Sequence, residues 1–257
     1  MELDPQQAPA TGLDMNELAA PQKTRLIAPV WHTVTIAALI LANSFLGAAP
    51  KSSLTGGNAR ILLYSGTFLV ELFLVLLIWF WVRRAGISMK ELIGGRWKTP
   101  EDFLLDVGIA IGFLVVSSLV LVGARVALGT LDLHNVSKQV EDTKRMLGPL
   151  IPRSKLEAGL FVLLSVFAGL FEEIIFRGYF QRQFGAMARS PIIGIIGAAA
   201  LFGLAHGYQG PRMMIAIGIF GVLFGILAHL RKSLRPGMMA HAIQDAYSGL
   251  ALYFFFR

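Results

Sequence analysis

Long apolar runs separated by short polar stretches fill the chain from residue 26 onward. A helix needs about 20 apolar residues to cross a bilayer. The runs that approach or exceed this length lie at 26–49, 61–82, 103–129, 155–183, 191–207, 213–230 and 236–256. The pattern predicts an all-α fold, a polytopic transmembrane helical bundle of about seven spans.

The polar and apolar stretches also suggest three regions. Residues 1–25 are polar, contain three prolines and have no apolar period, which predicts a disordered tail. The first apolar run resembles a signal peptide, but it is longer than a usual signal core and Pro50 follows it, so we interpret it as a retained span. Residues 26–154 are then N-terminal membrane helices and loops, and residues 155–257 are a helical catalytic core.

The basic residues favour one orientation. Lys and Arg gather in the loops, and more of them lie on the inner side if the N-terminus is cytoplasmic, as the positive-inside rule requires. Residues 136–147 are typical of a short amphipathic helix at the membrane interface. We expect a multi-pass protein of the bacterial inner membrane with a cytoplasmic N-terminus.

Composition excludes several classes of protein. With 55% hydrophobic and only 15% charged residues, the chain is too apolar for a soluble domain. The net charge of +7 comes from residues that flank the spans, so we predict no nucleic-acid partner. The expected partners are the lipid bilayer and a membrane-associated peptide or protein. The absence of cysteine excludes disulfides, Cys-bound metals and thiol catalysis.

The first polar group within an apolar run is Glu172-Glu173-Ile-Ile-Phe-Arg177. Glu173 and Arg177 are four residues apart with the acid first, the favoured order for an ion pair along a helix. Adjacent helical residues point about 100° apart, so Glu172 is left without that partner and suits a general base. In the alternative interpretation, all three residues mark a helix end at the interface, where their side chains reach water.

Two further motifs add imidazoles. Phe202 and His206 share a helix face, as do His241 and Asp245. A lone histidine in an apolar helix is usually structural, but two of them with a glutamate pair supply what amide hydrolysis needs: a base, a group that positions water and groups that face the developing oxyanion. Because charges inside a membrane are costly, these motifs predict a functional site in an intramembrane cavity.

Together the motifs resemble the CPBP family of CAAX prenyl proteases and bacteriocin-processing intramembrane proteases, also called the Abi family. The similar region runs from about residue 155 to residue 245 and contains the signatures Glu172-Glu173-x-x-x-Arg177-Gly178, Phe202-x-x-x-His206 and His241-x-x-x-Asp245. The resemblance implies an all-helical membrane bundle that cleaves peptide bonds of membrane-associated substrates, including CAAX-like ones.

The resemblance also implies roles for individual residues. Glu172 would be the general base and His206 would orient the water. His241 and residue 245 would face the tetrahedral oxyanion, and Glu173, Arg177 and Phe202 would support the site.

One position departs from the family pattern. Residue 245, often Asn in the family, is Asp here, and an ionised Asp cannot donate a hydrogen bond to an oxyanion. Either Asp245 is protonated, or it accepts a hydrogen bond that orients His241. We favour the second role.

Metal dependence is open, since the family has been described both as metal-dependent and as using glutamate with histidine. Glu172, His206 and His241 offer ligand atoms that zinc accepts. The chain has no His-Glu-x-x-His helix, the usual zinc-protease arrangement. We favour catalysis without a cofactor, with zinc as the alternative.

Distances along the chain fit only part of this site. Glu172 and His206 are similarly far from a turn near residue 188 and should be level, whereas His241 lies close to the turn at 231–235, so a helix must bend or tilt. Glu71, a lone acid in the second span, could reach the cavity, but we favour pairing with an Arg or Ser elsewhere.

Three functions remain. The leading one is an intramembrane endopeptidase in which Glu172 activates water. The first alternative is a non-catalytic membrane scaffold or immunity protein of the same fold. The second is a small transporter or proton relay, which would show repeat symmetry and acids spread over several spans.

Overall fold

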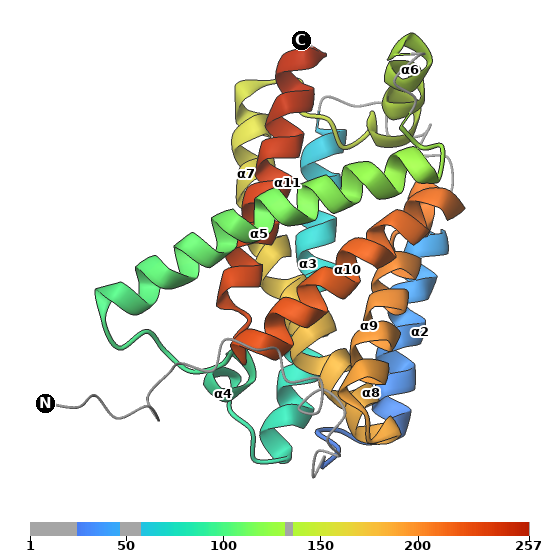
Figure 1. Cartoon of the computed structure of the whole chain (residues 1–257). Helices are drawn as coiled ribbons and strands as arrows, with labels where there is room; N and C mark the ends of the chain where they lie inside the picture. Colours follow the sequence, from blue (N-terminus) through green and yellow to red (C-terminus); the bar gives the residue numbers. More distant parts are fainter. Residues whose placement is uncertain (1–24, 47–57, 132–135, 257) are drawn as a thin grey trace, which may run out of the picture.

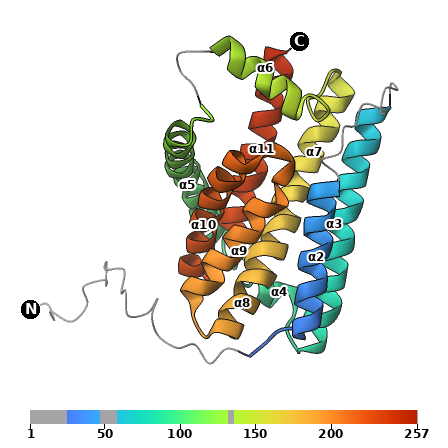
Figure 2. The ribbon, with the colours of Figure 1, turned by 90° about the vertical axis from the view of Figure 1, so that its right-hand side faces the viewer.

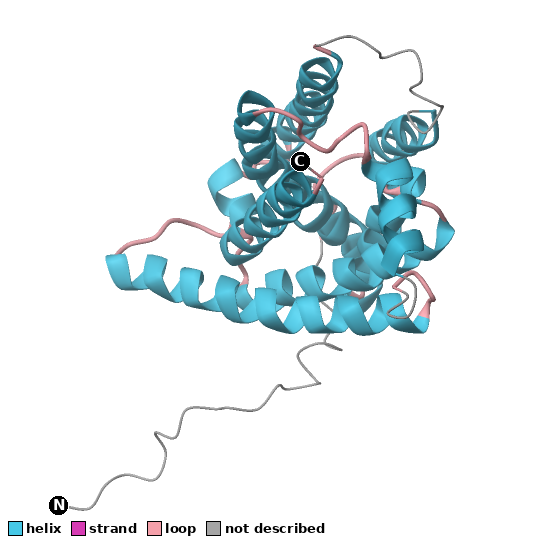
Figure 3. Ribbon diagram, turned by 90° about the horizontal axis from the view of Figure 1, so that it is seen from above, coloured by secondary structure: helices cyan, strands magenta, loops and turns pink. Residues whose placement is uncertain are grey.

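The computed structural model describes residues 25–46, 58–131 and 136–256, so the predicted tail lies outside the described part, apart from Arg25. Within these ranges the chain is helical and contains no strand, which confirms the predicted all-α fold (Figures 1 and 3). The elements are α2 (Val30–Leu46), α3 (Ala59–Arg84), α4 (Met89–Ile93), α5 (Pro100–Ala127), α6 (Val136–Leu147), α7 (Lys155–Glu172), the π-helix η3 (Glu173–Phe180), α8 (Gln181–Ala188), α9 (Pro191–Ala205), the 3₁₀ turn η4 (Gly207–Gln209), α10 (Pro211–Arg231) and α11 (Arg235–Phe255).

Every predicted apolar run contains a helix, but the helices differ as candidate spans. In the described part, four stretches are long and apolar enough to cross a membrane: α3, α5, the continuous stretch 155–188 and α10. Helices α2 and α9 are apolar but shorter. Helix α11 has 21 residues, yet His241, Gln244 and Asp245 interrupt its apolar sequence. The polar side chains of the site therefore weaken the very pattern by which a span is recognised.

Local sequence signals start the helices that carry the motifs. The Ser154 hydroxyl accepts a hydrogen bond from the Glu157 amide at 3.1 Å and begins α7. Ser190 caps α9 in the same way, at 3.4 Å from the Ile193 amide, and Pro191 occupies the first turn of that helix. Such caps satisfy amide groups that have no partner within the helix.

The bundle surrounds the stretch that contains α7, η3 and α8. Helix α11 packs along α7, α10 packs along α9, and α3 packs on the other side of α7. Figure 2 shows α2 and α3 on one flank of the molecule and α5 on the opposite flank. Helix α5 crosses α10 and α11 obliquely (Figure 1), and little of its apolar surface is covered.

A polar clamp fixes the turn between α10 and α11. The carboxylate of Asp106, fully buried on α5, accepts hydrogen bonds from Arg231 Nη2 at 2.7 Å, Arg235 Nε at 3.1 Å and Trp97 Nε1 at 2.8 Å. The clamp ties the start of α11 to α5. The oblique path of α10 also places this turn higher in Figure 1 than the turn between α8 and α9, and this tilt is how His241 comes level with Glu172.

Helices α7 and α11 approach each other closely at Gly169. A Cβ atom at this position would lie 2.6 Å from the Ala242 backbone nitrogen and 2.9 Å from the Met238 carbonyl oxygen. Membrane helices have no strong hydrophobic drive to associate, so small residues at the contact let the backbones pack together. Gly169 thus sets the distance between the two helices that carry Glu172 and His241.

The substitution Gly169→Ala should destabilise the protein by about 1–3 kcal/mol, because overpacking forces the helices apart. Thermal or denaturant unfolding in detergent would measure it. Gly159→Ala on the same helix is the matched control, since its Cβ would meet nothing within 4 Å. Equal stability of the two variants would contradict the close contact.

Candidate active site

The glutamate pair straddles a change of helix type. Glu172 is the last residue of α7, and Glu173 is the first residue of a π-helical segment in which all eight residues are buried. The sequence predicted one regular α-helix here. The Tyr179 hydroxyl is hydrogen-bonded to His32 Nδ1 at 2.7 Å and to Thr33 Oγ1 at 3.0 Å, so α2 holds the wider turn in place. Such π-helical segments frequently occur at functional sites.

The ion pair predicted from the four-residue spacing is present and deeply buried. Arg177 Nη1 donates to Glu173 Oε1 at 3.0 Å, and both side chains are 1% exposed. Arg177 Nη2 donates to the Gly221 carbonyl on α10 at 3.2 Å. The guanidinium also lies over the rings of Phe202 and Phe224, 4.5 and 5.0 Å from their centroids. One side chain thereby links η3, α9 and α10.

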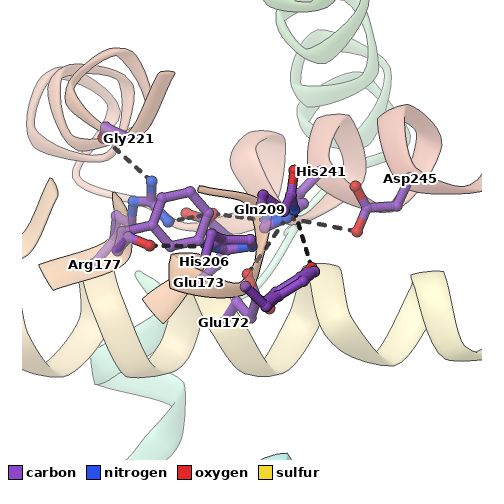
Figure 4. Close-up of polar contacts among 10 residues, drawn as sticks. Glu172, Glu173, Arg177, His206, Gln209, Gly221, His241 and Asp245 are labelled. Atoms are coloured by element: carbon purple, nitrogen blue, oxygen red, sulfur yellow. Dashed lines mark hydrogen bonds and ion pairs between the residues drawn. The ribbon is translucent and has the colours of Figure 1, made fainter. Parts of the chain in front are cut away.

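His241 stands between the carboxyl groups (Figure 4). Its Nδ1 is hydrogen-bonded to Glu173 Oε1 at 3.1 Å, and its Nε2 lies 3.6 Å from Glu172 Oε2 and 3.7 Å from Asp245 Oδ2. The last two distances exceed a good hydrogen bond. In this arrangement Glu173, and not Asp245 as favoured from the sequence, makes the hydrogen bond that orients the imidazole.

Glu172 keeps an oxygen free of hydrogen bonds. Its Oε2 is buried, and no described residue donates a hydrogen bond to it. The acid without an intrahelical ion pair, as predicted from the spacing, therefore faces His241 Nε2. This oxygen keeps a hydrogen-bonding capacity that no described residue uses.

His206 lies just beyond the end of α9. Its Nδ1 is 2.9 Å from the Phe202 carbonyl oxygen, which can only accept, so Nδ1 carries a proton, and in the neutral imidazole the lone pair is then on Nε2. The Phe202 ring is 4.8 Å from the His206 ring and 6.0 Å from the His241 ring, measured between centroids. Among the described residues no hydrogen bond joins Glu172 to His206. His206 interacts electrostatically with Asp245 at the same site.

Two further residues lie near the site: Glu71, for which the sequence left a place in the cavity as the less favoured alternative, and Tyr208, which the sequence did not identify. Glu71 interacts electrostatically with Glu172, His241 and Asp245, and no described residue donates a hydrogen bond to its buried Oε2. Within the described ranges Glu71 therefore has neither the expected Arg nor the expected Ser as a partner. The signal that points to this residue is its isolation as the acid of an apolar span. Tyr208 also interacts with Glu172, Asp245 and Glu71, and its position after His206 gave no such signal.

The described residues do not form a metal centre. No group of three or more His, Cys, Asp or Glu side chains within the described ranges is arranged to hold a metal ion. The set Glu172, His206 and His241, which formed the zinc alternative, is not such a group. Zinc ligands must converge on one point at about 2 Å, and we therefore derive no step through a metal.

The buried ion pair predicts a large effect on stability. Arg177→Met should cost about 3–5 kcal/mol, because it leaves the Glu173 carboxylate without its cation. Unfolding of the purified protein in detergent would measure the loss. The double variant E173Q/R177M should lose less than R177M, since it leaves no buried charge unpaired, and an R177M variant as stable as the wild type would contradict the pairing.

The segment that contains the three motifs resembles a known protein family. The family model of the Rce1-like type II CAAX prenyl endopeptidases matches residues 154–247, which include all three motifs. The comparison with curated proteins gave no match, and the comparison with solved structures gave none. With the apolar helices, the match indicates an integral, multi-pass membrane protein. The resemblance predicted from the motifs is thus confirmed, over residues 154–247, as one to the CAAX prenyl endopeptidases.

Proposed function

We propose that this protein is an intramembrane endopeptidase that hydrolyses a peptide bond of a membrane-associated, CAAX-like substrate. The observation that carries the proposal is the buried Oε2 of Glu172, which has no hydrogen-bond donor among the described residues and lies 3.6 Å from His241 Nε2. The match to the CAAX prenyl endopeptidases at residues 154–247 supports the type of reaction.

In the proposed reaction Glu172 takes a proton from water while the water oxygen bonds to the carbonyl carbon. The lone pair on His206 Nε2 orients the water as a hydrogen-bond acceptor. The electron pair of the carbonyl double bond moves to its oxygen, which becomes an oxyanion. The electron pair on the oxyanion then reforms the carbonyl double bond as the carbon–nitrogen bond breaks, and the proton held by Glu172 goes to the leaving amine.

The neighbours of His241 favour its protonated form during this step. Its Nδ1 proton is held by Glu173, and the carboxyl groups of Glu172 and Asp245 lie on its other side. An imidazolium would direct its Nε2 proton at the oxyanion, and preorganised donors of this kind stabilise the transition state. Glu173 in turn is fixed by Arg177.

Glu172→Gln should lower the rate of cleavage by at least about 10²-fold, because the amide cannot take a proton from water. The assay would follow an internally quenched peptide carrying an S-farnesyl cysteine near its C-terminus, with the protein in proteoliposomes. The variant should insert and unfold as the wild type does.

The matched control for this substitution is Glu141→Gln. Glu141 is exposed on α6, far along the chain from the motifs, so its loss should leave the rate unchanged. If E172Q keeps the cellular phenotype and the wild type cleaves no substrate, the scaffold alternative replaces the proposed function.

We also propose that the reaction proceeds without a metal, since Glu172 and the two histidines supply the base, the water-orienting group and a donor. Cleavage of the same peptide should survive chelation and dialysis within about a factor of two. Metal analysis of the purified protein is the paired measurement. Stoichiometric zinc that is lost together with activity would overturn this part of the proposal.

A further inference from the structure

The site has many hydrogen-bond acceptors and few free donors. Arg177 Nη1 donates a hydrogen bond to Glu173, and Arg177 Nη2 donates one to the Gly221 carbonyl. His206 Nδ1 is committed to Phe202, and His241 Nδ1 to Glu173. Nε2 of a protonated His241 is a donor that could face an oxyanion, since its nearest carboxylate oxygens lie at 3.6 and 3.7 Å.

Position 245 deepens this shortage. An amide at this position would offer two N–H donors, whereas the Asp245 carboxylate offers none when ionised. Its side chain is 40% exposed and keeps access to water. An oxyanion near His241 and Asp245 therefore needs a donor from another residue.

Tyr208 is placed to supply that donor. Its ring centroid is 6.0 Å from that of His206, and it interacts electrostatically with Glu172, Asp245 and Glu71. Gln209 Nε2 donates to the Tyr208 hydroxyl oxygen at 3.0 Å. Because this bond uses the oxygen as an acceptor, the hydroxyl proton stays available for a second partner.

Helix α2 holds the turn that carries Tyr208. Ser44 Oγ accepts a hydrogen bond from the Gly207 amide and donates one to the Leu204 carbonyl, each at 3.0 Å. A Cβ at position 207 would lie 2.8 Å from the Phe45 ring, so glycine permits this contact. A donor on a fixed turn needs little reorganisation during the reaction.

The hydroxyl also keeps its proton under working conditions. Partial removal from water, for a residue that keeps 39% of its surface exposed, and then the negative charge of Glu172, Asp245 and Glu71 raise the pKa of Tyr208 to about 12. Tyr208 therefore donates a hydrogen bond without losing its proton. It differs in this respect from Glu172, which accepts and releases the proton of water.

We propose that Tyr208, with its hydroxyl polarised by Gln209, gives the oxyanion the hydrogen bond that Asp245 cannot give. The proposal rests on the proposed peptidase function. When the water oxygen bonds to the carbonyl carbon and the carbonyl oxygen becomes negative, that oxygen accepts from Tyr208 Oη–H and from His241 Nε2–H. Tyr208 touches the reacting atoms and is in this sense a catalytic residue.

The test is Tyr208→Phe, which removes the hydroxyl and keeps the ring. With the S-farnesyl peptide and proteoliposomes, kcat should fall about 10²-fold while KM changes less than about threefold, since the contact forms only in the transition state. Tyr247→Phe is the matched control, because Tyr247 lies on α11 with 71% of its surface exposed. Its kcat should equal that of the wild type.

A double-mutant cycle separates this role from a structural one. In a D245N background the new amide can donate to the oxyanion, so Y208F should then cost less than about tenfold. An equal loss in both backgrounds would overturn the proposal in favour of a purely structural tyrosine or one that positions Glu172.

The outcomes for the two proposals are distinct. Cleavage that E172Q abolishes and Y208F leaves unchanged overturns the role of Tyr208 alone. Failure of the wild type to cleave the peptide, or full activity of E172Q, overturns the proposed peptidase function and this inference with it.

Discussion

The buried ion pair between Glu173 and Arg177 is the interaction on which the other contacts of the site depend. Glu173 Oε1 accepts from both Arg177 and His241, so one oxygen joins η3 to α11. Arg177 adds the Gly221 carbonyl and two aromatic faces, which joins the same segment to α9 and α10. In a low-dielectric interior a charge is stable only when an opposite charge is paired with it. The positions of η3, α9, α10 and α11 therefore all depend on this one ion pair.

The charged groups around this pair give Glu172 and Glu173 different hydrogen-bond partners. Four carboxyl groups lie near one another at the site, those of Glu71, Glu172, Glu173 and Asp245. The basic side chains that face them are Arg177, paired with Glu173, and His241, which lies near Glu172. Glu173 Oε1 accepts hydrogen bonds from Arg177 and His241, whereas no described residue donates to the buried Oε2 of either glutamate. The two adjacent glutamates thus differ in their partners: Glu173, at the start of the π-helical turn, is held in the ion pair with Arg177, and Glu172, at the end of α7, is not.

Much of this arrangement could be predicted from sequence, because periodic signals are local. The apolar runs predicted every long helix, the four-residue spacing predicted the Glu173–Arg177 pair, and the three motifs predicted the segment 154–247 that the family model matches. The π-helix, by contrast, depends on hydrogen bonds between Tyr179 and residues of α2, which are far away in the sequence. The same is true of Glu71, whose level relative to Glu172 follows from Phe68 packing on Phe167 and Phe171, with centroids 4.9 and 5.8 Å apart. Such contacts between helices have no signature within a single span.

The depth of His241 in the bundle follows from the same kind of long-range contact. The start of α11 is fixed where Asp106 of α5 binds Arg231 and Arg235, and Gly169 lets α11 press against α7 just beyond that point. Lipid chains are as apolar as the helix surfaces, so burial alone would not choose among possible tilts of α10 and α11. The tilt of these helices is instead selected by the polar clamp at the start of α11 and by the close backbone contact at Gly169. The position of the imidazole is therefore set by interactions outside the motifs, and a chain with all three motifs but without the clamp would lack the constraint that brings His241 to Glu172.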